Sequence, residues 1–281
     1  MATTTARPLI WAAGILSGLE KAHNFGSPLV VNRDYEGTIT TEGSSVRVNR
    51  IGAITIGNYT GIDIDLEDLD TTAITLLIDQ AKYFNFGIDD VEAGALGGAI
   101  SRELMTKASR GAAYGLRDVA DITIATAMVA GADGGINDLG AVTVDAPGEL
   151  YSLLVDAKVR LDQNSVPSLG RFAVIPAVAA GYLLEDNRFV LDGVSTAARD
   201  TGDIFRAAGF TLVPSNNVPT AAGVSQVVFG TNDATSFAEQ IVSVKEYAPE
   251  KRFSSAVKGL HVYGVKVIAP EYLGLASVTF A

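Results

Sequence analysis

The stretch FNFGIDDVEAGALGGAISRELMTKASRGAAYGLRDVADITIATAMVA, residues 84–130, decides the fold of this chain. Phe84, Phe86 and Ile88 alternate with smaller or polar residues, which is the pattern of a β-strand. Residues 90–130 contain no proline and change to steps of three and four, which predicts one long helix. The positions on its stripe are Leu96, Ile100, Leu104, Ala108, Ala112, Leu116, Val119 and Thr123.

The predicted helix is long for a chain of 281 residues. Asp89, with Glu92 three residues later, forms a capping-box variant at its start. The sequence does not decide whether the helix bends at Gly97-Gly98 or at Gly111. The helix would run ~60 Å, whereas a compact sphere of this chain length would be only about 48 Å across. We therefore expect a flat or elongated molecule, a shape common in shells and uncommon in small enzymes.

Composition narrows the function classes. Hydrophobic residues make up 48% of the chain and charged residues 19%, which is typical of a protein that folds. The net charge of −11 argues against a polyanion-binding surface as the main purpose. Cysteines are absent and histidines number two, which excludes thiolate metal sites, disulfides and cysteine nucleophiles. We expect no signal peptide and no membrane-spanning helix.

Residues 1–30 read as an arm without sustained periodicity. Trp11 and Phe25 would be costly to leave in water, so they should be buried. Burial on a partner and burial in the chain's own core are supported equally by the sequence.

Residues 31–62 alternate with period two, which predicts an extended β-hairpin. The expected turn lies at 42–45, between GTITT and SVRVNR. The polar side carries Arg33, Arg47 and Arg50. Because a two-stranded hairpin is marginal alone, it must lie on another surface, and its charges suggest another subunit.

The stretch DIDLEDLD, residues 63–70, gathers carboxylates into a short segment. Its acidic residues are Asp63, Asp65, Glu67, Asp68 and Asp70. A hard-cation site is one interpretation, but the spacing fits no EF-hand loop. A solvated acidic face, or a docking partner for the hairpin arginines, is favoured. Strands should follow at 72–78 and 82–88.

The second half of the chain alternates between helices and strands. Pro147 opens a helix, a strand follows at 171–175, a helix begins after Pro176, and a strand lies at 210–213, which predicts an α/β subdomain. The later strands should return to the sheet begun before the long helix, making that domain discontinuous. They are expected at 241–247, 257–269 and 275–280.

Each enzyme template fails on a specific residue. Gly259 and Gly264 have the spacing of a phosphate loop, but the Lys and hydroxyl that such a loop needs are misplaced. Residues 133–138 resemble a calcium loop without its distal glutamate. His23 and His261 are expected to be structural, and Asp89-Asp90 to cap the helix. We expect no catalytic, cofactor or metal site.

Several stretches occur in an order that resembles the major capsid proteins of tailed bacteriophages, which share the Hong Kong 97-type fold. They are FNFGIDD at 84–90, LDQNSVP at 161–167, GRF at 170–172, GFTL at 209–212, PSNNVP at 214–219 and VKGLHVYG at 257–264. The resemblance covers most of the chain from Leu29 onward. It implies an α+β fold built around an arm, an extended loop, a spine helix and an α/β domain.

The resemblance also implies a domain division and a function. The arm would be 1–30, the extended loop 31–62, the peripheral domain 63–146 with 230–281, including a spine helix at about 90–130, and the axial domain 147–229. Such proteins form hexamers and pentamers of icosahedral shells that enclose double-stranded DNA without specific binding. The expected location is the virion, after assembly in the host cytoplasm, with no enzyme activity, cofactor or membrane.

Two departures from the family sharpen the expectation. Some members join subunits by an isopeptide bond from an extended-loop lysine to an asparagine, but residues 31–62 contain no lysine. A guanidinium stays protonated and cannot replace that nucleophile, so we predict a shell without covalent links. The chain also has no long, charged N-terminal extension, so we expect a separate scaffolding protein beside a portal and, as an option, a decoration protein.

The candidate subunit-interface residues follow from the arm, the hairpin and the acidic segment. They are Trp11, Phe25, Arg33, Arg47, Arg50, Asp63, Asp65, Glu67 and Asp68. An encapsulin-type nanocompartment is the alternative from the same fold. A metal-dependent acidic hydrolase is the alternative from another class.

Overall fold

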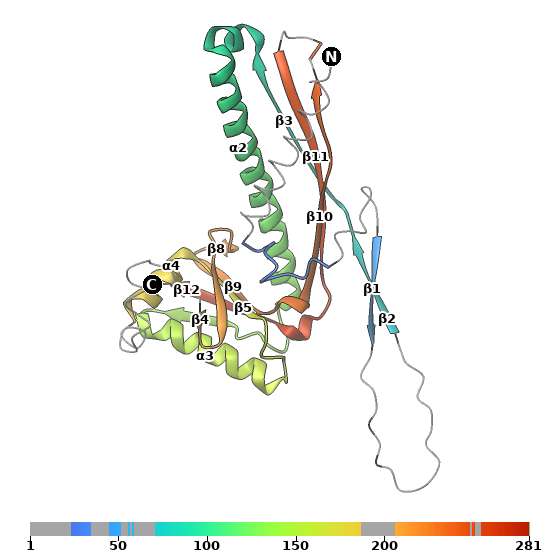
Figure 1. Ribbon diagram of the computed structural model, residues 1–281. Helices are drawn as coiled ribbons and strands as arrows, with labels where there is room; N and C mark the ends of the chain where they lie inside the picture. The colour runs from blue at the N-terminus through green and yellow to red at the C-terminus, as the bar shows by residue number, and fades with distance from the viewer. Residues whose placement is uncertain are drawn as a thin grey trace.

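The computed structural model describes residues 24–34, 45–51, 56, 58, 71–186, 206–247, 249–250 and 254–280. Figure 1 shows an elongated molecule in which a long helix lies beside a three-stranded sheet, an α/β part lies at the C-terminal end of that helix, and a β-hairpin projects from the body. No helix in the described ranges is long and apolar enough to cross a membrane.

The long helix, α2 (Asp90–Ala132), has 43 residues and passes through the glycines at 97, 98 and 111 without interruption. At 1.5 Å per residue it measures ~64 Å, so the predicted spine is confirmed. The predicted stripe is correct at Leu116 but not at Val119, which is 41% exposed. Beyond Leu116 the buried face continues through Ala120, Ile124 and Met128, because steps of four keep these residues on one side.

The sheet beside α2 has the order β10-β11-β3 and is antiparallel. Its strands are β3 (Gln80–Asp89), β10 (Thr235–Tyr247) and β11 (Ser254–Val267). The first two of the predicted late strands therefore return to the sheet begun before the helix, whereas the third, expected at 275–280, joins the other sheet. Phe84 and Val257 pack with Ala113 and Leu116 of α2. A Cβ at Gly259 would lie 2.2 Å from the Phe84 ring, so this glycine serves close packing.

The α/β part is built on a seven-stranded sheet whose main path is β4-β12-β9-β5-β7-β6, with β8 (Thr220–Ala221) paired to β9. The strands on that path are β4 (Ala141–Val144), β5 (Arg171–Ile175), β6 (Arg206–Ala207), β7 (Phe210–Pro214), β9 (Val224–Thr231) and β12 (Leu273–Phe280). Two helices pack against it, α3 (Pro147–Gln163) and α4 (Ala177–Glu185). The predicted helix at Pro147 and the strands at 171 and 210 are all present.

The sheets divide the chain differently from the expected boundaries at two strands. The ranges 63–146 and 230–281 contain β4 and β12, yet both strands belong to the seven-stranded sheet. The reason is visible in β12, which is apolar on both faces: Leu275 packs in the core beside α2, and Val278 packs in the core beneath α3. A strand buried on both faces needs a neighbour at each edge, and β9 and β4 provide them.

The projecting hairpin pairs β1 (Ser45–Ile51) with β2 (Thr71–Leu77), from Ser45 opposite Leu77 to Ile51 opposite Thr71. The sequence did not predict β2 as the partner of β1. The expected partner at 37–41 lies outside the described residues. The inner end of the hairpin rests on its own chain, because Val46 and Leu76 pack with Ala238 and Val262 of the three-stranded sheet.

Candidate functional site

The N-terminal segment, residues 24–34, is anchored in the body of its own chain. Phe25 is fully buried in a cluster that contains Ile124 and Met128 of α2 and Phe172 of β5. This places Phe25 in its own core, the second of the two readings left open by the sequence, and corrects its assignment as a candidate interface residue. Trp11 lies outside the described residues.

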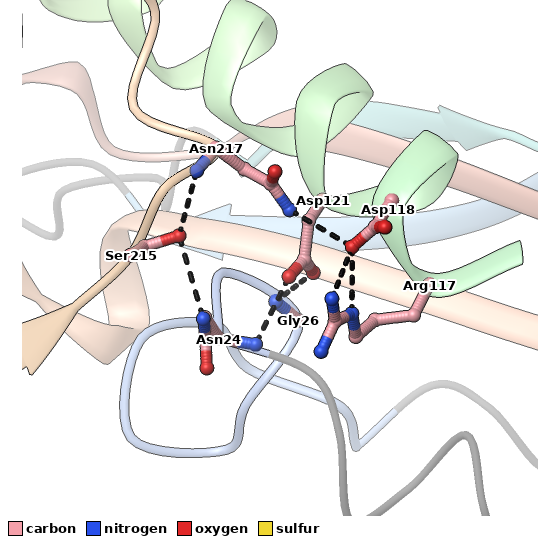
Figure 2. A network of polar contacts seen from close by, with 7 residues as sticks. All are labelled: Asn24, Gly26, Arg117, Asp118, Asp121, Ser215 and Asn217. Atoms are coloured by element: carbon pink, nitrogen blue, oxygen red, sulfur yellow. Dashed lines mark hydrogen bonds and ion pairs between the residues drawn. The ribbon is translucent and has the colours of Figure 1, made fainter. Parts of the chain in front are cut away.

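A buried carboxylate holds the backbone of this segment (Figure 2). Asp121 of α2 is 0% exposed. Its Oδ2 accepts a hydrogen bond of 3.0 Å from the Asn24 N–H, and its Oδ1 accepts one of 3.1 Å from the Gly26 N–H. Hydrogen bonds to a charged acceptor are stronger than neutral ones. Residues 24–26 are therefore fixed to α2.

The same network reaches the α/β part, as Figure 2 shows. The Asn24 Nδ2 donates to Ser215 Oγ at 3.4 Å, and the backbone N–H of Asn217 donates to the same oxygen at 3.1 Å. The Asn217 side chain donates to Asp118 Oδ1 at 3.4 Å, and Asp118 pairs with Arg117. The N-terminal segment, α2 and the turn after β7 thus meet at one junction.

Arg33 is engaged within its own chain. Its Nη1 donates to the Gly26 carbonyl at 3.1 Å, and its guanidinium pairs with Glu239 of β10. The other Glu239 oxygen lies 3.0 Å from Nε2 of the fully buried His261. Arg33, expected at a subunit contact, therefore fastens the N-terminal segment to β10, and the buried His261 lies on the other side of Glu239. The physical reason is that a nearly buried cation needs a partner close by.

Tyr263 of β11 packs in the core between His261 and α2. Its side chain is fully buried, and its hydroxyl lies 3.2 Å from Thr123 Oγ1. Burial raises the pKa of the Tyr263 phenol, the hydrogen bond with Thr123 opposes that rise, and the charge of Asp79 adds to it.

Of the remaining candidate residues, the two that the structure describes lie in β1 of the hairpin. Arg47 is exposed, and Arg50 lies in β1 opposite Thr72 of β2. Asp63, Asp65, Glu67 and Asp68 fall outside the described residues. In the sequence, the acidic stretch directly precedes β2, the strand that pairs with β1.

Large apolar side chains are exposed on the body and on the loop of the α/β part. Tyr83 is 80% exposed on β3, and Leu169 is 87% exposed between α3 and β5. The loop of Leu169 is braced by Arg171, which donates to the Val166 carbonyl at 2.6 Å and pairs with Asp162 at 2.7 Å. Within the described ranges, no three His, Asp or Glu side chains gather as metal ligands would.

A family model described as phage capsid protein matches residues 71–278, which is most of the chain. The chain belongs to the phage capsid protein family. The capsid protein is 26% identical to the chain solved from Mycobacterium phage Che8, with a TM-score of 0.69 and 88% of each chain covered.

More distant structures share the fold of this capsid protein. The mature capsid of bacteriophage PhiM1 is 15% identical, with a TM-score of 0.61 and coverage of 88% of this chain and 87% of the other. The SrpI encapsulin complex from Synechococcus elongatus is 12% identical, with a TM-score of 0.53 and coverage of 85% and 83%. No curated protein sequence matches. The fold is of the Hong Kong 97 type, and the family indicates a structural protein rather than an enzyme.

Sequence reasoning missed the junction at Asp121. Its members are ordinary polar residues separated by up to 191 positions, as between Asn24 and Ser215. The predicted stripe gave no signal, because Asp121 lies two positions from both Val119 and Thr123 and therefore on the opposite side of the helix. On the observed buried face its neighbours are Ile124 and Ala125, three and four positions later.

Proposed function

We propose that this capsid protein assembles into hexamers and pentamers of an icosahedral shell that encloses double-stranded DNA. The observation that carries the proposal is the projecting β1–β2 hairpin, which leaves the body of the subunit while its inner end packs on its own sheet (Figure 1). A hairpin of this kind is marginal alone. A neighbouring subunit would supply the surface that it lacks.

The shell is held together without isopeptide links. Residues 31–62 contain no lysine. The cationic side chain that the structure describes in β1 is the guanidinium of Arg47. A guanidinium remains protonated and forms ion pairs instead of amide bonds. Exposed ion pairs are individually weak, but a closed shell repeats each of them many times.

The direct test is electron microscopy of the purified protein together with a denaturing gel of mature particles. Closed shells or capsomers, with a single band at the subunit mass, are expected. A ladder of covalently linked bands would contradict the non-covalent shell. A stable monomer with metal-dependent hydrolysis would contradict the capsid role itself.

An encapsulin-type compartment is the second candidate, since structures of that kind share the fold. The match to the phage capsid family over residues 71–278 favours the virion. Purified particles that protect DNA from nuclease support the phage head, whereas particles filled with an enzyme support the compartment. Scaffolding, portal and decoration partners stay predictions, as does assembly in the host cytoplasm. Expression of this protein alone, followed by measurement of shell size, tests the need for a scaffold.

A further inference from the structure

Two lysines lie side by side on the open face of the three-stranded sheet. Lys245 of β10 and Lys258 of β11 are a register pair, and both are exposed. Val257, the neighbour of Lys258, packs on the α2 side, so the lysines point to the opposite face. Like charges directly opposite each other are destabilising. Among the described residues, neither ammonium has a carboxylate within ion-pair distance.

The neighbouring side chains position Lys258, one member of this basic pair. Tyr247 lies across the sheet, because its register partner Ala256, and Gly87 beyond it, are small. The Tyr247 hydroxyl lies 2.9 Å from Nδ2 and 3.1 Å from Oδ1 of Asn85 on β3. The ammonium of Lys258 sits 4.7 Å from the centre of the Tyr247 ring, at cation–π distance. The Lys258 ammonium is therefore already positioned to bind an anion in the unbound subunit.

The acidic stretch 63–70 of the same chain cannot reach this pair. Thr71 is at the outer end of β2, and Figure 1 shows β2 and β3 following each other along nearly one line. Asn85, which is aligned with Lys258, is therefore roughly 46 Å from Thr71 at about 3.3 Å per residue. Eight extended residues span at most about 28 Å. An acidic stretch that meets these lysines must come from another copy.

We propose that the pair Lys245 and Lys258, framed by Tyr247 and Asn85, binds the acidic stretch 63–70 of a second copy of this chain. The proposal rests on the proposed shell, in which the hairpin of one subunit reaches the next. Five carboxylates in eight residues supply the complementary charge. Charge pairs of this type set partner choice and register, and salt weakens them because they are exposed.

Carbodiimide crosslinking tests this contact, because it forms an amide only between a carboxylate and an amine already in contact. Particles are assembled from a mixture of unlabelled and ¹⁵N-labelled protein, and the linked peptides are read by mass spectrometry. Links from Lys245 or Lys258 to 63–70 with mixed isotopes are expected. Particles without mixed links overturn the contact alone, whereas failure to obtain any particle overturns the shell and the contact with it.

Charge reversal provides the second arm. The variant Lys245→Glu with Lys258→Glu should lose intact particles by more than about tenfold, since like charges would then face each other. Adding Asp65→Lys and Asp68→Lys should restore them. Lys266→Glu, also exposed and on β11, is the matched control and should assemble normally. Normal assembly of the variant with both lysines changed to glutamate overturns the proposal. If that variant assembles but fails to retain DNA, the proposal is also overturned, and nucleic acid is identified as the anion that the two lysines bind.

Discussion

At the scale of single residues, the structure depends on a few buried polar side chains that hold residues 24–34. Asp121, Arg33 and Glu239 each hold a segment that is distant in sequence. Composition and periodicity predict where apolar residues go, but they do not say which carboxylate will find which backbone N–H. Phe25 illustrates the limit: its burial was predictable, whereas the surface that buries it was not.

Asp121→Ala should lower the free energy of unfolding by about 2 kcal/mol, because the N–H groups of Asn24 and Gly26 lose a buried acceptor. Chemical denaturation of the isolated subunit measures this. Asp118→Ala is the control, since that carboxylate is 45% exposed and its loss should cost less. Equal losses for the two variants would contradict the anchoring role of Asp121.

Tyr263 predicts a fall in stability at alkaline pH. The pKa of its phenol is raised in the folded protein. The folded protein therefore keeps the phenol proton to a higher pH than the unfolded chain, which releases it at about pH 10. The stability is fully present below that pH and declines as the pH rises through the folded value. Unfolding titrations from pH 8 upward should show this decline, and Tyr263→Phe should make it shallower. An identical decline in both proteins would assign it to other groups.

At the scale of elements, the sequence predicted best where one pattern runs long. Residues 90–130 lack proline and keep a helical period, so α2 was predicted within two residues of its end. The partner of β1 was missed because pairing depends on β2, which lies beyond an intervening stretch of chain. The place of β12 was missed because an apolar strand gives no sign of which sheet it joins.

Gly259→Ala tests the contact between β11 and β3. The added Cβ would meet the Phe84 ring at 2.2 Å, so the ring must move or the strands must part. We expect a loss of roughly 1–3 kcal/mol. Combining it with Phe84→Leu, which removes the ring, should recover part of this loss relative to the sum of the two single variants. Simple additivity in thermal or chemical unfolding would show that the two residues do not compete for space.

At the scale of the whole molecule, changes in the exposed hairpin should affect the stability of the shell without affecting the stability of the isolated subunit. Arg47→Ala with Arg50→Ala should leave the unfolding of the isolated subunit unchanged within error, because Arg47 is exposed. The same variant should form shells that dissociate at lower salt or temperature, as followed by light scattering. Shells as stable as those of the unchanged protein would remove the hairpin arginines from the account of cohesion.

The continuity of β2 with β3 has a mechanical consequence. Any pull on the hairpin along its length is passed directly into β3, which pairs with β11 through ten consecutive residue pairs. Hydrogen bonds of an antiparallel ladder lie perpendicular to the strands, so such a pull shears all of them together instead of opening them one at a time. The subunit is thus built to resist tension in the direction in which its hairpin points.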